Sequence, residues 1–220
     1  MLLQTLSSKV DQHLSLFCGV PVSLSSFDFI CTLSPEFILE HCPEVDGLPG
    51  SFVAINNSEE AFVSIHFDSS IFNLLNTSGD IATLLENEGG LSATLIVTEE
   101  ISHFHHFVNC ANENRTISKL HLETLAEIQK VAVSALIAAE ILGDHHIHPI
   151  IDYVFNQSHV HGTMTNYRLA SKNAERFWKK SIQRYGKGLL SNYKFRDDLR
   201  NISRSIENPE GRISDILSAA

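Results

Sequence analysis

Signatures of several large protein classes are missing from this 220-residue chain. No stretch approaches the roughly 18 consecutive apolar residues of a transmembrane helix, so we expect no membrane span. Residues 1–9 place no basic cluster before an apolar block, which argues against a secretory signal peptide. Cys18, Cys31, Cys42 and Cys110 lack C-x-x-C spacing, and a chain of this size needs no disulfide staple. These absences predict reduced cysteines and a protein that is either cytoplasmic or exported by a route that leaves no recognisable leader.

Two common catalytic motifs are also absent. Gly89-Gly90 and Gly186-Lys187-Gly188 lack the spacing of a phosphate-binding loop. The chain contains no G-x-S-x-G sequence, which disfavours a serine hydrolase of the α/β-hydrolase class.

Basic residues are scarce over most of the chain. Residues 1–162 contain 4 Lys and Arg against 20 Asp and Glu, whereas residues 163–200 contain 10 against 3. The net charge of −10 would repel a polyanion, so we expect no nucleic-acid partner. The basic segment 163–200 is either a solvated helix face or a surface that docks on the acidic body or on a protein partner.

Hydrophobic periodicity predicts an α+β fold that is mostly helical. Two runs with strand character, 51–55 and 61–67, predict a small antiparallel β-hairpin or sheet in the N-terminal third. Residues 1–186 are expected to form a single globular domain, with a helix and hairpin part over 1–90 and a helical part over 91–186. Residues 187–220 are expected to form a polar, partly helical tail. Helices are predicted over 1–17, 35–41, 69–76, 80–88 (ended by Gly89-Gly90), 91–112, 117–142, 149–156 and 163–185.

Acidic side chains and one histidine recur at helical spacing in the helical part. Glu99, Glu100 and His103 form an E-E-x-x-H sequence, and Glu123 and Glu127 form E-x-x-x-E twenty residues later. Residues four apart share a helix face, and a short link makes consecutive helices antiparallel neighbours. Buried carboxylates and imidazoles are costly unless they are paired, protonated or bound to a metal. The pattern therefore predicts a metal site between two helices.

This pattern resembles the gluzincin branch of zinc metallopeptidases, whose motif is H-E-x-x-H on one helix and E-x-x-x-D on the next. The resemblance implies a metal-dependent, peptidase-related hydrolase with a peptide or small-molecule substrate, and an edge strand such as 61–67 that holds an extended peptide. Glu99, His103 and Glu123 fall on the ligands of the divalent metal. Glu100 falls on the general base that activates the metal-bound water, and Glu127 on the acidic residue that orients a ligating histidine.

The chain departs from the family motif at the first ligand, where Glu99 stands in place of a histidine. Zinc is the metal that the resemblance implies, but two carboxylates and one imidazole suit iron or manganese better. The departure also leaves Glu127 without an imidazole to orient.

Other residues are candidates for supporting roles. A metal-assisted hydrolase needs a donor for the developing oxyanion, and four side chains qualify by their position after the second motif helix. These donors are Tyr153, His159, His161 and Tyr167. Arg168 and Arg176 would bind a substrate carboxylate or pair with the glutamates. His145, His146, His148 and Asp152 form either a separate metal site or a polar loop rich in histidine.

Two other interpretations use the same motif residues. In the first, the glutamates are solvated and His103 is a satisfied core histidine, and the chain is a non-enzymatic adaptor or effector with an acidic body and a basic C-terminal helix. In the second, the chain is a non-haem di-iron oxidase, because such proteins build their sites from E-x-x-H motifs on bundled helices. Glu100 and His103 would supply one motif, completed by Glu123, Glu127 and Glu140.

Overall fold

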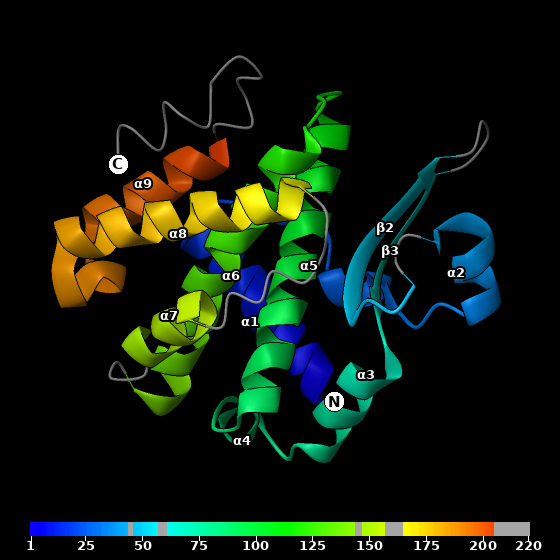
Figure 1. Cartoon of the computed structure of the whole chain (residues 1–220), viewed down its shortest axis with the longest axis horizontal. Helices are drawn as coiled ribbons and strands as arrows, with labels where there is room; N and C mark the ends of the chain where they lie inside the picture. The colour runs from blue at the N-terminus through cyan, green and yellow to red at the C-terminus, as the bar shows by residue number, and fades with distance from the viewer. Residues whose placement is uncertain (44–45, 57–60, 144–146, 157–164, 205–220) are drawn as a thin grey trace.

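The computed structural model describes residues 1–43, 46–56, 61–143, 147–156 and 165–204. Long helices dominate it, and a small sheet lies to one side (Figure 1). The mostly helical fold predicted from the sequence is confirmed. The helices are α1 (Leu2–Leu16), η1 (Ser26–Phe29), α2 (Pro35–His41), α3 (Ser69–Thr77), α4 (Ile81–Leu85), α5 (Glu88–Asn112), α6 (Lys119–Leu142), α7 (Ile147–Asn156), α8 (Thr165–Tyr185), η4 (Gly186–Ser191) and α9 (Tyr193–Arg204).

The sheet is mixed, and the prediction of a purely antiparallel hairpin is wrong. Strands β2 (Gly50–Asn56) and β3 (Ala61–Phe67) pair in antiparallel register, as their alternating sequences predicted. The short strand β1 (Ile30–Cys31) adds to the other side of β3 in parallel. Strand β3 is therefore the central strand, and β2 rather than the predicted 61–67 segment is the full-length edge.

Helices α5 and α6 form an antiparallel pair through the middle of the molecule (Figure 1). Asn87 and Ser118 cap their N-termini with side-chain oxygens, and α6 ends at Gly143 as predicted. Gly89 and Gly90 do not end the preceding helix, because they lie inside the first turn of α5. A Cβ at Gly90 would lie 2.0 Å from the carbonyl oxygen of Leu84, so glycine is needed there for close packing against α4.

The main core surrounds this helix pair. Helix α1 packs against both α5 and α6, while α8 crosses α6 and covers its other side (Figure 1). Phe177 of α8 stacks on Phe195 of α9, Trp178 packs against the same ring at a tilt, and all three side chains are buried. The packed core therefore extends beyond residue 186 into the segment predicted to be a polar tail.

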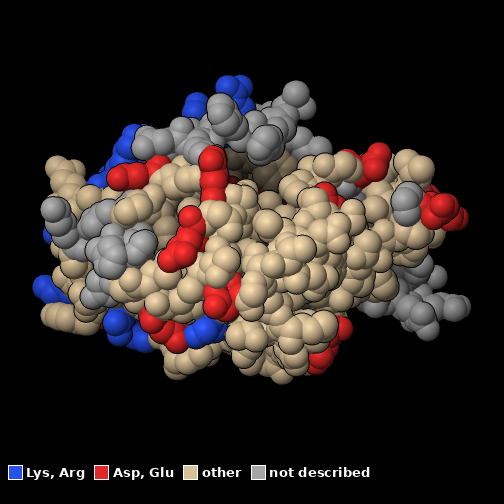
Figure 2. All heavy atoms as spheres, turned by 90° about the horizontal axis from the view of Figure 1, so that it is seen from below, with Lys and Arg blue, Asp and Glu red and all other residues tan. Residues whose placement is uncertain are grey.

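Charge is distributed unevenly over the surface. In Figure 2 acidic side chains are scattered over the visible face, and Lys and Arg gather mainly at the end that carries α8 and α9. Within the described ranges, no helix combines the length and the apolar character that crossing a membrane requires.

Candidate metal centre

The antiparallel pair α5 and α6 brings the two predicted motifs face to face. Glu99, Glu100 and His103 lie within about one turn of each other on α5, and Glu123 lies in the second turn of α6. His103 Nε2 is 3.2 Å from Glu123 Oε2, which confirms the predicted approach of the two helices at this point. Glu100, His103 and Glu123 are all buried, with 8%, 6% and 4% of their surface exposed. The motif residues thus face the helix interface rather than solvent.

His103 lies between two carboxylates. Its Nδ1 is hydrogen-bonded to Glu100 Oε2 at 3.2 Å, and its Nε2 faces Glu123. Burial alone would lower the pKa of His103, but the two carboxylates outweigh that effect and raise the pKa well above its usual value. His103 Nε2 and Glu123 Oε2 lie at ion-pair distance. Both atoms are buried without a hydrogen-bond partner in the described part of the chain.

Lys130 holds the remaining two motif glutamates. Its Nζ lies 2.7 Å from Glu99 Oε2 on α5 and 2.7 Å from Glu127 Oε1 on its own helix. Burial would raise the pKa of Glu99, but Lys130 and His103 lower it overall. Glu127 keeps a raised pKa because burial outweighs its contact with Lys130. Glu127 thus contacts the ammonium group of Lys130, in place of the ligating histidine that the family motif would have it orient.

The sheet closes the site beside Glu100. A Cβ at Gly50, the first residue of β2, would lie 2.5 Å from Ile96 Cγ2 and 3.3 Å from Glu100 Cγ. The absence of a side chain at Gly50 therefore lets the strand lie directly on α5. Burial, above all, raises the pKa of Glu100. A carboxyl group in this environment is suited to holding or accepting a proton.

Three of these side chains can hold a metal ion. Glu99, His103 and Glu123 each offer one ligand atom, and the three atoms lie within 4.8 Å of one another. Among the described residues, four carboxylates in the cluster face at most two cations, Lys130 and a protonated His103. Because excess negative charge is costly in a buried site, the electrostatics favour a bound cation.

Tyr167, in the first turn of α8, completes the described surroundings. Its hydroxyl is close enough to Glu123 for that carboxylate to act on its pKa. Burial and the neighbouring carboxylates of Glu123, Glu100 and Glu99 raise its pKa, so the phenol stays protonated and able to donate. Of the four predicted oxyanion donors, Tyr167 is the one that the described structure brings to the centre.

Other predicted residues lie elsewhere. Tyr153 donates its hydroxyl to the carbonyl of Glu88, near the start of α5. Glu140 pairs with Lys9 and His13 of α1, more than four helical turns from Glu123, so it cannot complete a di-iron site with the motif residues. Asp152 is exposed. Five predicted histidines fall where the side chain is not described, namely His145, His146, His148, His159 and His161.

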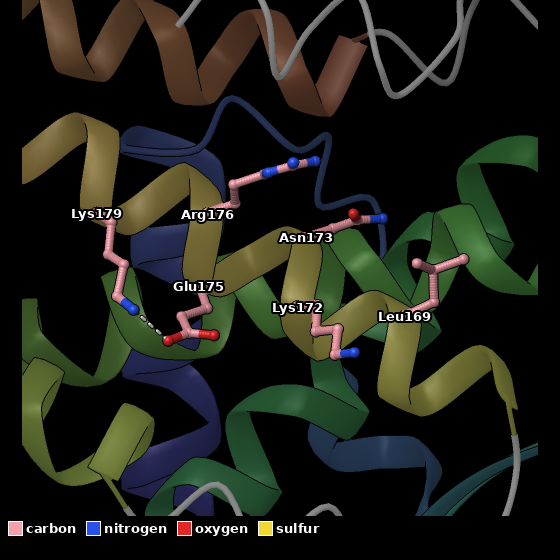
Figure 3. A pocket seen from close by; sticks show the side chains of 6 residues that line it. All are labelled: Leu169, Lys172, Asn173, Glu175, Arg176 and Lys179. Carbon is pink, nitrogen blue, oxygen red and sulfur yellow. Dashed lines mark hydrogen bonds and ion pairs between the residues drawn. The ribbon is translucent and has the colours of Figure 1, made fainter.

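A shallow groove of about 440 Å³ lies along the outer face of α8 (Figure 3). Its described lining consists of Leu169, Lys172, Asn173, Glu175, Arg176 and Lys179. Arg176 lines this groove, and Arg168 is exposed. Neither arginine pairs with the motif glutamates in the described part of the chain.

The sequence reasoning missed two features of the helix pair. Lys130 lies three residues after Glu127 and seven after Glu123, so helical spacing alone was a sufficient signal that it shares their face. The second feature is a neutral network in which Gln129 Oε1 accepts from Ser102 Oγ and His106 Nε2. Gln129 Nε2 then donates to Ser203 of α9, a contact between distant segments that no local spacing signals.

Comparison of the chain with models of protein families, with curated proteins and with solved structures finds no match. The gluzincin resemblance therefore stays a prediction, and the function has to be argued from the geometry of the site.

Proposed function

We propose that this protein binds one divalent metal ion between α5 and α6 and uses it for hydrolysis. The ligands are His103 Nε2 and one carboxylate oxygen each from Glu99 and Glu123. The observation that carries the proposal is the buried ion pair of His103 Nε2 and Glu123 Oε2, 3.2 Å apart, in which neither atom has a hydrogen-bond partner in the described structure. Buried polar atoms in native proteins are normally paired, so this pair supports a shared ligand.

The contact between Glu100 and His103 supports ligation through Nε2. A metal-bound histidine usually donates its other ring N–H to a carboxylate, which fixes the tautomer and the ring orientation. Glu100 Oε2 lies 3.2 Å from Nδ1 and is placed for this role. The ion would then take the place of the proton on Nε2 and reduce the excess negative charge of the cluster.

Hydrolysis is the chemistry that this set of groups favours. Three protein ligands leave a coordination position open for water, and a bound divalent ion lowers the pKa of that water. Glu100, with its raised pKa, would accept a proton at its carboxylate. The hydroxyl of Tyr167 would donate to developing negative charge beside Glu123. We propose zinc as the ion, with iron or manganese as the alternatives that the carboxylates suit.

Elemental analysis of untagged protein tests the metal centre. We expect about one equivalent of a transition metal in the wild type and less than about a tenth of that in His103→Ala, because the only nitrogen ligand is lost. His41→Ala is the matched control, since His41 lies on the exposed side of α2. Equal metal content in the wild type and His103→Ala would reject the centre.

Turnover tests the hydrolytic part separately, with fluorescently labelled casein as the probe. Glu100→Gln should retain most of the metal and lose at least about a hundredfold in rate, because the amide cannot accept a proton. Tyr167→Phe should retain the metal and lose about tenfold or more. If the wild type binds stoichiometric metal but cleaves neither casein nor a p-nitrophenyl ester, hydrolysis is rejected and the metal centre is structural.

The second candidate function is a non-enzymatic adaptor, which the groove on α8 favours. Lys172 and Arg176 line this groove and have no ion-pair partner in the described part of the chain (Figure 3). Such a surface suits an acidic protein segment. Metal-free wild-type protein, together with unchanged thermal stability in the presence of zinc, would favour this candidate over the hydrolase.

A further inference from the structure

The geometry points to Lys130 as the residue that selects which class of divalent ion enters the centre, by restricting Glu99 to one ligand oxygen. This inference rests on the proposed metal centre. Lys130 belongs to no ligand position in the motif. Its role follows from where its ammonium group lies.

The contacts of Lys130 form a partly buried bridge between the two helices. Its Nζ lies 2.7 Å from Glu99 Oε2 and 2.7 Å from Glu127 Oε1. The exposed fractions of the Lys130, Glu99 and Glu127 side chains are 13%, 17% and 15%. Charge-assisted hydrogen bonds in so protected a position are strong and fix the carboxylates they engage. One oxygen of Glu99 is therefore committed to Lys130.

This commitment limits the number of donor atoms at the centre. With Oε2 engaged, Glu99 offers a single free oxygen, and the protein supplies two carboxylates and one imidazole. Calcium takes about six to eight oxygen ligands and often a bidentate carboxylate, while magnesium needs near-octahedral oxygen coordination. Zinc, iron and manganese accept imidazole, and zinc accepts four ligands. The centre should therefore take a transition metal in preference to calcium or magnesium.

The charge on Lys130 acts in the same direction. The ammonium offsets one of the four carboxylates and lies beside Glu99 rather than beside His103. Without it, the same group of side chains would be more negative and would offer a second oxygen from Glu99. Both changes favour hard cations, which are held mainly by charge and oxygen number.

A selectivity measurement tests this role. The test variant combines Lys130→Met with Glu127→Gln, which removes one positive and one negative group and leaves no orphaned partner at Glu127. Dissociation constants for Zn²⁺, Mn²⁺ and Ca²⁺ are measured by competition titration on wild type and variant. We expect the preference for Zn²⁺ over Ca²⁺ to fall at least about tenfold in the variant. A ratio unchanged within about threefold would overturn the role of Lys130.

The ion pair between Lys179 and Glu175 provides the matched control. It has the same residue types on the surface of α8, with Nζ and Oε1 2.6 Å apart. Lys179→Met with Glu175→Gln should leave the selectivity unchanged, and a shift as large as that of the test variant would overturn the assignment. Lys130→Arg retains the charge and should retain the preference for Zn²⁺.

The two proposals fail differently in this experiment. A wild type that binds none of the three ions would overturn the metal centre and this inference together. A wild type that binds Zn²⁺ with a selectivity independent of Lys130 would overturn this inference alone. If Lys130→Met with Glu127→Gln loses its helical circular dichroism, the comparison is made with Lys130→Gln. An unchanged Zn²⁺ to Ca²⁺ ratio in that variant would equally overturn the role.

Discussion

Helices α5 and α6 enclose two polar clusters that differ in how well their groups are paired. The neutral cluster joins Ser102, His106, Gln129 and Ser203. The amide of Gln129 uses both its oxygen and its nitrogen in hydrogen bonds, and the hydroxyl of Ser203 donates a hydrogen bond to the carbonyl oxygen of Leu199. The charged cluster includes His103, the residue next to Ser102. Within the described ranges, His103 Nε2 and Glu123 Oε2 are buried there without a hydrogen-bond partner.

This difference separates a structural network from a candidate site on the same pair of helices. A fully paired neutral network fixes the position of α9 against α5 and α6 and has no free group for a ligand. A charged cluster with spare carboxylate oxygens is unfavourable for stability alone, since buried ion pairs often contribute nothing net. The presence of such a cluster in this core therefore argues for binding, and mutations in the two clusters should have opposite effects on metal affinity and on stability.

The largest effect is expected for Glu123→Gln in the charged cluster. Metal affinity should fall about a thousandfold, or about 4 kcal/mol, because a neutral amide oxygen replaces a carboxylate ligand. The free energy of unfolding of the metal-free protein should change by less than about 1 kcal/mol, because the amide keeps the size and polarity of the side chain. Isothermal titration and chemical denaturation measure the two quantities.

Glu86→Gln is the control for this substitution, because Glu86 is exposed at the end of α4. It should change neither quantity. If Glu123 served only as a structural partner of His103, the result would be reversed, with a stability loss of about 3–5 kcal/mol and no effect of metal.

The elements that carry the charged cluster were predictable from the sequence. Apolar residues at three- and four-residue steps identify α5 and α6, and the short turn between them requires an antiparallel arrangement. Two residues on adjacent antiparallel helices near a short link must approach each other, which is why the proximity of His103 and Glu123 was predicted correctly. Local spacing suffices when both partners lie close to the same turn.

The features that sequence reasoning missed depend on contacts between distant segments. Strand β1 is two residues long and exists through its pairing with β3, so it has no period to detect. The sequence predicts that Gly90 ends a helix, but the glycine is needed because the carbonyl oxygen of Leu84 packs against it. The bond from Gln129 to Ser203 joins residues 74 positions apart. Such contacts are decided by tertiary packing, which local patterns do not record.

A smaller effect, of opposite kind, is expected for Gln129→Leu in the neutral cluster. Leucine has a similar volume but leaves the buried polar groups of Ser102, His106 and Ser203 without their common partner. The free energy of unfolding should fall by about 3 kcal/mol, while metal affinity stays within about threefold of wild type. Gln183→Leu on the exposed face of α8 should change stability by less than about 0.5 kcal/mol. If Gln129→Leu lost more free energy of metal binding than free energy of unfolding, the two clusters would have to be treated as one site.

The smallest effect concerns the response of the neutral cluster to pH. Burial, above all, lowers the pKa of His106 from 6.5 to about 4. The unfolded chain therefore binds a proton near pH 6.5 that the folded protein resists until about pH 4, so this group makes stability fall as the pH falls through that window. Between pH 6.5 and pH 5.5 the loss of stability from this one residue should be about 1 kcal/mol.

His106→Gln keeps a donor toward Gln129 and does not titrate, so its stability should decline less over the same interval. All other titratable groups are common to both proteins, so their contributions cancel in the difference between the two denaturation curves. A difference curve that is flat from pH 6.5 to pH 5.5 would mean that water reaches His106 in the folded state, and the neutral cluster would then no longer be the closed structural counterpart of the charged one.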